Sequence, residues 1–309
     1  MSSYVAALGL AAACLYRRFR IIALMVLTAI IALRGPDLEL LTVQAYPTSF
    51  QTSSTNFAAA SIVRGQLLFD QNCVACHGVR GDGQGVLASD LRIKPADLTM
   101  PHLWEHSEGE LLWWLTHGIE DPKGGLAMPG FPGLSKSDRW AMIDYIRAHN
   151  AALAMRRDTK FQVPVAAPAL PLRCSGINAS RTADLGGTVV HVVTEDLMEE
   201  SPPVPPQLGV AIVNLKLRPT NADTGTLLPG SCVAVTPAAW QAYAILADLP
   251  PDKLPGTEFL IDPNGWLRAV HTPGSSGGWP TSDHLIAAVR GICASPIQQA
   301  SEGDHEHRH

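Results

Sequence analysis

The sequence of 309 residues has little charge and no basic surplus. Charged side chains make up 17% of it, and 23 lysines and arginines stand against 28 aspartates and glutamates, for a formal net charge of −5. Nothing in this balance favours nucleic acid, which needs a basic surface. Low charge combined with 46% hydrophobic residues indicates a folded chain with additional apolar segments.

The sequence also lacks an apolar run of full membrane-spanning length. Such a helix needs roughly 20 apolar residues, whereas the two runs near the N-terminus cover residues 3–16 and 21–33, with three arginines in 17–20 between them. Either run alone has the length of a signal-peptide core. Because the nearest small-residue cleavage site, before Tyr46, lies far beyond the second run, we favour an uncleaved membrane anchor over residues 1–45, formed by a membrane helix or a helical hairpin. The alternative is a buried, soluble helical hairpin, although neither run has a polar face. The arginines then face the cytoplasm, and everything after about residue 45 lies outside it.

Composition divides the remaining chain into two folded domains, two linkers and a tail. A Ser/Thr-rich linker is expected over residues 46–60 and a Pro/Ala-rich linker over residues 151–170. Residues 61–150 form the first domain, residues 171–296 form the second, and residues 297–309 form a His-rich tail.

The first domain has helical patterns with recognisable starts. Residues 61–72 have helical spacing, with Ser61 available as the N-cap. Residues 107–110 and 135–138 each have the spacing of a capping box before an apolar run. The segment 119–134 is dense in glycine and proline and is not expected to be helical.

The second domain alternates strand-like and helix-like stretches. Runs rich in β-branched residues at 187–194 and 208–217 predict strands, and residues 257–271 predict a hairpin. Helical patterns occur at 238–249 and 283–294. Alternation of this kind predicts an α/β domain.

The stretch Cys73-Val74-Ala75-Cys76-His77 has the C-x-x-C-H spacing of a covalent haem attachment site. The two cysteines can each form a thioether to a haem vinyl group, and the histidine then lies beneath the iron as its axial ligand. A structural zinc site would need two further ligands, and no second C-x-x-C is present. A redox disulfide motif would follow a strand, whereas this motif follows an expected helix. We therefore predict one haem c per chain, held by Cys73, Cys76 and His77.

The sixth ligand decides what such a haem does. A methionine closes the iron and suits electron transfer, whereas an open position suits oxygen or peroxide chemistry. Met128 is the predicted ligand, because its Gly/Pro loop can aim a thioether inward, with a gap-filling core methionine as the alternative. Met100, which also precedes a proline, is the rival ligand. We interpret His102, His106 and His117 as structural or surface residues, with bis-histidine ligation as a minor alternative.

Several stretches of the first domain occur together and in order: SIVRGQLLFDQNCVACHGVRGDGQG, KPADLTMPH, HSEGELLWWLTHGI, AMPGF and LSKSDRWAMIDYIRA. Over residues 46 to about 150 the sequence resembles the mono-haem cytochrome c domain fused to bacterial CopD-type copper-resistance membrane proteins. The resemblance implies an all-α class I cytochrome c fold in which Cys73, Cys76 and His77 bind haem and Met128 is the distal ligand. It also implies the bacterial inner membrane as the location, with both folded domains in the periplasm.

Residues 165 to 295 resemble a degenerate thioredoxin-like domain, through the stretches DLGGTVVHVV and TEFLIDPNGWLRA. The dithiol of such a domain would follow the first stretch, where TEDLMEESPPVPP stands instead, so dithiol exchange is not predicted. Cys174, Cys232 and Cys293 allow one disulfide and one free thiol, in any of the three pairings.

Together these patterns predict a multidomain electron carrier that is not an enzyme: a membrane-anchored periplasmic c-type cytochrome transferring single electrons. The expected partners are the membrane and redox proteins of the bacterial respiratory chain or of a copper-handling system, with no nucleic acid and no small-molecule substrate. The alternative is a copper-handling accessory protein in which haem is secondary, because His305, His307 and His309 of the tail could bind copper weakly. A haem enzyme with an open iron site is a third, minor hypothesis.

Overall fold

The computed structural model describes residues 21–22, 24–26, 48–121, 123–158, 161, 163–194, 211–219, 227–234, 236–274, 279 and 282–297. The predicted anchor and the predicted His-rich tail lie almost wholly outside these residues, as does the stretch that replaces the thioredoxin dithiol. Within the described ranges, no helix is both long enough and apolar enough to cross a bilayer. By its internal contacts the chain divides into residues 1–47 and 48–309, and the second unit contains both folded domains.

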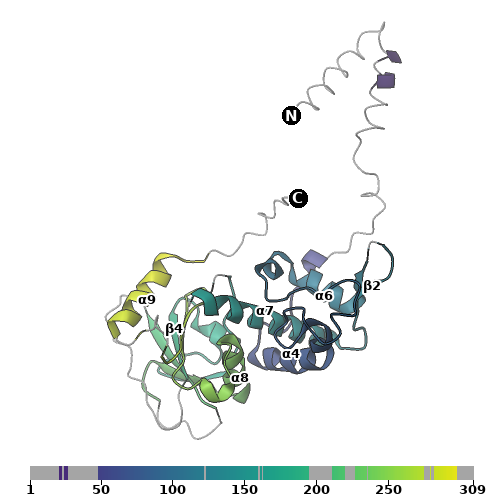
Figure 1. Cartoon of the computed structure of the whole chain (residues 1–309). Coiled ribbons are helices and arrows are strands. Elements are labelled where there is room, and N and C mark those ends of the chain that lie inside the picture. Colours follow the sequence, from purple (N-terminus) through teal and green to yellow (C-terminus); the bar gives the residue numbers. More distant parts are fainter. Residues whose placement is uncertain are drawn as a thin grey trace. The chain divides into compact units, whose positions relative to one another are not determined.

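The N-terminal part of this second unit consists of helices, the irregular segments that connect them and one small hairpin (Figure 1). Its elements, in chain order, are η1 (Thr48–Phe50), α4 (Ala59–Asn72), α5 (Val74–His77), η2 (Pro101–Glu105), α6 (Glu108–His117), β1 (Gly118–Glu120), β2 (Leu126–Pro129) and α7 (Lys136–Asp158).

The ends of these helices only partly follow the predicted caps. Ser107 is the N-cap of α6, and its hydroxyl accepts a hydrogen bond from the Glu110 amide (3.2 Å). Ser135 precedes α7 and exchanges hydrogen bonds with Asp138, which confirms the second capping box. The prediction for α4 was wrong in detail: the helix begins at Ala59, so Ser61 lies inside it and is not its N-cap.

Helices α4 and α7 cross at close range and form the core of the helical part. A Cβ atom at Gly65 would lie 1.9 Å from the Ala141 carbonyl oxygen, so only glycine fits at this crossing. Ile62 and Phe69 of α4 and Trp140 of α7 are almost completely buried around it. The crossing fixes the end of α4, from which the cysteine motif continues.

Helix α7 continues beyond the predicted end of the first domain. Residues 151–158, expected in the linker, add two further turns to α7, with Ala151 and Met155 buried. The Pro/Ala-rich segment then runs back past the start of α4, where the Ala59 amide donates to the Ala169 carbonyl (3.2 Å). The expected linker is therefore partly packed structure.

The C-terminal part contains a six-stranded mixed sheet with strand order β3-β6-β5-β4-β7-β8. Strand β4 pairs in parallel with β5, and β5 in parallel with β6, while the remaining neighbours are antiparallel. The elements are β3 (Leu172–Ser175), η3 (Thr182–Leu185), β4 (Val189–Thr194), β5 (Ile212–Leu217), β6 (Ser231–Ala234), α8 (Pro237–Leu246), η4 (Pro251–Lys253), β7 (Glu258–Ile261), β8 (Leu267–His271) and α9 (Ser282–Ala294).

This sheet is covered on both faces, which confirms the predicted α/β domain. Every residue of β4 is buried, as expected for a central strand with a nearly continuous apolar sequence. Helix α8 belongs to a large apolar cluster that also includes residues of α4 and α7, whereas α9 belongs to a smaller cluster with Val189 and Leu260. The four neighbours β5-β4-β7-β8, with one parallel and two antiparallel pairings, have the strand arrangement of a thioredoxin-like core.

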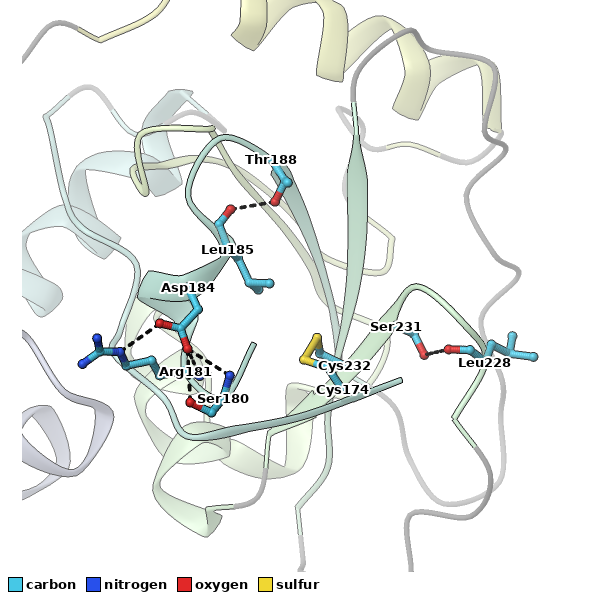
Figure 2. Close-up of a disulfide and its surroundings, with 9 residues drawn as sticks. All are labelled: Cys174, Ser180, Arg181, Asp184, Leu185, Thr188, Leu228, Ser231 and Cys232. Atoms are coloured by element: carbon cyan, nitrogen blue, oxygen red, sulfur yellow. Dashed lines mark hydrogen bonds and ion pairs between the residues drawn. A yellow bond between two sulfur atoms is a disulfide. The ribbon is translucent and has the colours of Figure 1, made fainter. Parts of the chain in front are cut away.

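The structure also decides the cysteine pairing that the sequence left open. Cys174 of β3 and Cys232 of β6 lie directly opposite each other in the antiparallel ladder and form a disulfide (Figure 2). Cys293, in α9, is a free thiol.

Candidate haem site

A cavity of about 230 Å³ in the helical part brings together all four predicted ligands and attachment residues. Cys73, Cys76, His77 and Met128 lie on its wall, although Met128 is about fifty residues further along the chain. The rest of the lining is mainly apolar and includes Leu103, Leu111, Trp114, Leu115, Ile119 and Phe131. Such a lining suits an apolar group.

The cysteine motif is held by the end of α4 and by the single turn α5. The Cys73 amide donates to the Phe69 carbonyl (2.8 Å), and the His77 amide donates to the Cys73 carbonyl (2.8 Å). This turn places both cysteines and His77 on the wall of one cavity. Gly78, with φ of 78°, then ends the turn in a conformation that favours glycine. Cys73 and Cys76 are free thiols, so both sulfur atoms are available for thioether bonds.

His77 is oriented by one hydrogen bond. Its Nδ1 lies 2.9 Å from the Ala96 carbonyl oxygen, and since a carbonyl can only accept, Nδ1 carries the hydrogen. Burial lowers the pKa of His77 below its ordinary value, although the bond to Ala96 opposes this shift. A neutral imidazole protonated at Nδ1 leaves the Nε2 lone pair free for a metal, as in many histidine ligands.

Cys73 is kept as a neutral thiol. Burial first, and then electrostatic repulsion from Cys76 and Asp70, raise its pKa to about 12. The raised pKa reflects the apolar surroundings of Cys73 on the cavity wall.

Met128 is presented by a distorted hairpin. Strands β1 and β2 pair Ile119 with Met128 and then Glu120 with Leu126, so Ala127 is an extra residue directly before Met128. Bulges of this kind redirect the neighbouring side chain. At the base of the hairpin, a Cβ atom at Gly118 would lie 2.4 Å from the Met128 carbonyl oxygen. The hairpin backbone is therefore held closely at the position of the predicted ligand.

The other candidate ligands differ in whether they line the cavity. Met100 is 46% exposed and does not line the cavity. His117 lies against Trp113, with ring centroids 3.8 Å apart, and is also absent from the cavity wall. His102 and His106 do line the cavity, a position that their sequence setting did not predict. Their separation of four residues, with Leu103 and Trp104 between them, was the available signal.

The residues that fix this wall were not predicted from the sequence either. The buried Asn150 of α7 accepts a hydrogen bond from the Trp104 indole (2.7 Å) and donates to the Leu98 and Met100 carbonyls. Arg147 donates to the His106 carbonyl (2.9 Å), and its guanidinium lies 5.1 Å from the centre of the Trp104 ring. Helix α7 thereby holds the irregular segment between Leu98 and α6 against the cavity.

Comparison with known proteins supports this assignment for the helical part. The Cytochrome c family model matches residues 62–150, so the helical part is a cytochrome c domain, and such a domain implies covalently bound haem c and electron transfer. Cytochrome c domains are typically electron carriers outside the cytoplasm. The donor set agrees, because two free thiols, a neutral imidazole and a thioether share one apolar cavity.

Two solved structures are each similar to less than half of this chain. A reducing HAO-like protein complex of Kuenenia stuttgartiensis is 26% identical over 33% of this chain and 48% of its own, with a TM-score of 0.27. BsSco, a member of the Sco family of cytochrome c oxidase assembly proteins, is 9% identical over 43% of this chain and 96% of its own, with a TM-score of 0.31. No curated protein matches the chain.

Proposed function

We propose that this protein transfers single electrons through one haem c, bound covalently by Cys73 and Cys76, with His77 and Met128 as the axial ligands of its iron. The observation that carries the proposal is the presence of these four side chains on one apolar cavity within a cytochrome c domain. The bound haem supplies an iron that changes its oxidation state by one electron.

The chain's own residues then set the conditions for electron transfer. His77 offers Nε2 while the Ala96 carbonyl fixes the ring. With haem bound, the Met128 thioether would be the sixth ligand of the iron, which would favour the reduced state and leave no open position for oxygen or peroxide. The apolar wall keeps water from the site, which also favours the less charged, reduced form. These features support an electron carrier and not a haem enzyme.

The proposal includes a location and partners. The apolar N-terminal runs and their arginines support a membrane anchor with the folded domains in the periplasm of a bacterium. The partners would be redox proteins of the respiratory chain or of a copper-handling system.

Absorption spectra of the full chain test the ligand assignment. We expect a c-type spectrum that stays with the denatured polypeptide, and a methionine–iron charge-transfer band in the oxidised protein. The Met128→Ala variant should lose this band and bind carbon monoxide, whereas Met100→Ala, the matched control, should retain the band. Persistence of the band in Met128→Ala would show that another residue is the ligand.

A copper-handling role is the second candidate, supported by the three histidines of the C-terminal tail. If this is correct, deletion of residues 302–309 should weaken copper binding and lower the copper tolerance of the cell while leaving the haem spectrum unchanged. Unchanged copper binding in the truncated protein would remove the support for this role.

A further inference from the structure

An ion pair joins the two loops that carry the proposed iron ligands. Arg92 belongs to the irregular segment that follows His77, and Asp121 belongs to the turn between β1 and β2, seven residues before Met128. The Arg92 guanidinium is paired with the Asp121 carboxylate. No motif in the sequence indicates this contact between the two loops.

The Asp121 side of the pair is built into the hairpin turn. The Asp121 side chain is only 5% exposed, and its Oδ1 accepts a hydrogen bond from the Lys123 amide (3.0 Å). The Asp121 amide donates to the Gly125 carbonyl (2.9 Å), which closes the turn. Arg92 Nη2 also donates to the Gly124 carbonyl (3.4 Å). One guanidinium therefore contacts both the carboxylate and the backbone of this turn.

The Arg92 side of the pair is tied to the cysteine motif. The Gly83 amide donates to the His77 carbonyl (2.9 Å), and the Gly85 amide donates to the Cys76 carbonyl (3.0 Å). Further along the same segment, the Lys94 ammonium donates to the Ala88 carbonyl (3.0 Å). The segment is thus attached to the motif that holds one axial ligand, and Arg92 extends from it.

The hairpin that carries Met128 is consequently held at both ends. At its base, the Phe131 amide donates to the Leu115 carbonyl (2.8 Å). At its tip, Arg92 contacts the turn through Asp121 and Gly124. Met128 lies between these two points, next to the bulge at Ala127. Release of the tip would leave Met128 held by the base of the hairpin, by its pairing with Ile119 and by its packing against the core.

We propose that the Arg92–Asp121 pair positions Met128 and so controls how readily the sixth ligand is displaced from the iron. This inference rests on the proposed function, because it requires Met128 to be that ligand. Arg92 and Asp121 act through the hairpin and are positioning residues. An ion pair with one buried partner, such as Asp121, contributes more than a fully exposed pair, although the exposed Arg92 weakens it.

Imidazole binding to the oxidised, haem-loaded full chain tests the proposal, because imidazole must displace the methionine. We expect Arg92→Ala to raise the affinity for imidazole by about 3- to 10-fold. Asp121→Asn keeps the oxygen that caps the turn but removes the charge, so it should have a similar effect. The double variant should raise the imidazole affinity no further than either single variant does, because both changes remove the same ion pair.

The matched control is Arg64→Ala, which removes the ion pair between Arg64 of α4 and Asp138 of α7 (2.9 Å), neither of which lines the cavity. It should leave the imidazole affinity unchanged. Hydrogen exchange provides a second measurement: the backbone amides of residues 119–129 should exchange faster in Arg92→Ala and Asp121→Asn, and less so in Arg92→Lys.

The two proposals fail in different ways. If wild-type protein shows the methionine–iron band but Arg92→Ala and Asp121→Asn bind imidazole and exchange amide hydrogens like Arg64→Ala, the positioning role is wrong and the proposed function stands. If the wild-type protein has no such band, the ligand assignment itself is wrong.

Discussion

The two folded domains use cysteine in opposite ways. In the cytochrome c domain, Cys73 and Cys76 are free thiols on the wall of a cavity. In the α/β domain, Cys174 and Cys232 are bonded to each other across two antiparallel strands, and Cys232 is completely buried. The first pair therefore has space beside it for a second group, whereas the second pair is closed by its own bond.

The same contrast holds for the backbone around each pair. The segment between α5 and α6 contains only the short η2 and is held by side chains such as Asn150 and Arg147. The disulfide lies in a ladder of regular strands, near the hydrogen-bonded group of Ser180, Arg181 and Asp184 in Figure 2. An irregular wall can accommodate a cofactor, whereas the closely packed ladder stabilises the fold.

The largest expected difference between the two domains is in haem content after removal of one or the other cysteine pair. Replacement of both Cys73 and Cys76 by alanine should abolish covalent haem attachment, because no thioether can form. Replacement of both Cys174 and Cys232 by alanine should leave the haem content per chain unchanged. Haem absorbance and the mass of the denatured chain measure both outcomes, and haem loss in the second variant would contradict the assignment.

A smaller effect concerns stability. The Cys174–Cys232 disulfide closes a loop with a sequence separation of 58 residues, and such a cross-link contributes about 4 kcal/mol to the free energy of unfolding. The Cys174→Ala, Cys232→Ala variant should lose about this amount in urea denaturation. An unchanged free energy of unfolding would mean that the disulfide has no stabilising role.

The smallest expected effect concerns how two buried aspartates, one from each domain, contribute to the free energy of unfolding. Burial is the main cause that raises the pKa of Asp144 to about 6, although Thr55 donates a 2.6 Å hydrogen bond to it. In the α/β domain, Asp262 is instead paired with Arg268 at 2.8 Å. The first carboxyl group therefore favours its proton in the folded state, whereas the second has a cationic partner.

The sign of the pH dependence of Asp144 follows from this shift. The folded state binds the proton more tightly than the unfolded state, so the contribution of Asp144 to stability falls by about 3 kcal/mol as the pH rises from about 4 to about 6. Asp144→Asn should remove this fall and stabilise the protein at pH 7. Asp262→Asn should instead destabilise it by about 3 kcal/mol, because Arg268 loses its partner. Urea denaturation across this pH range measures both, and identical behaviour of the two variants would show that the contrast is wrong.

Local patterns in the sequence predicted much of this molecule. The C-x-x-C-H spacing and the Gly/Pro setting of Met128 led to four residues that the structure places on one cavity. The capping boxes and the continuous apolar run of β4 likewise predicted real elements.

Features that depend on distant contacts were not predictable. Strands β3 and β6 are each four residues long; β3 is defined by its pairing with β6, and β6 pairs with both β3 and β5. The extension of α7 to Asp158 depends on the burial of residues such as Met155. The roles of Asn150 and Arg92 arise from partners about fifty and thirty residues away, and no local pattern marks them.

Our main conclusion is that the haem of the cytochrome c domain is the redox centre of this chain. A reductive titration of the full-length, haem-loaded protein that counts electrons per chain would decide it. We predict uptake of one electron, in step with the haem absorbance change. Cys174 and Cys232 should not react with thiol-labelling reagents, because structural disulfides resist mild reduction. Uptake of three electrons in the same potential range, with both cysteines becoming labelled, would show that the disulfide is a second redox centre and that this conclusion is wrong.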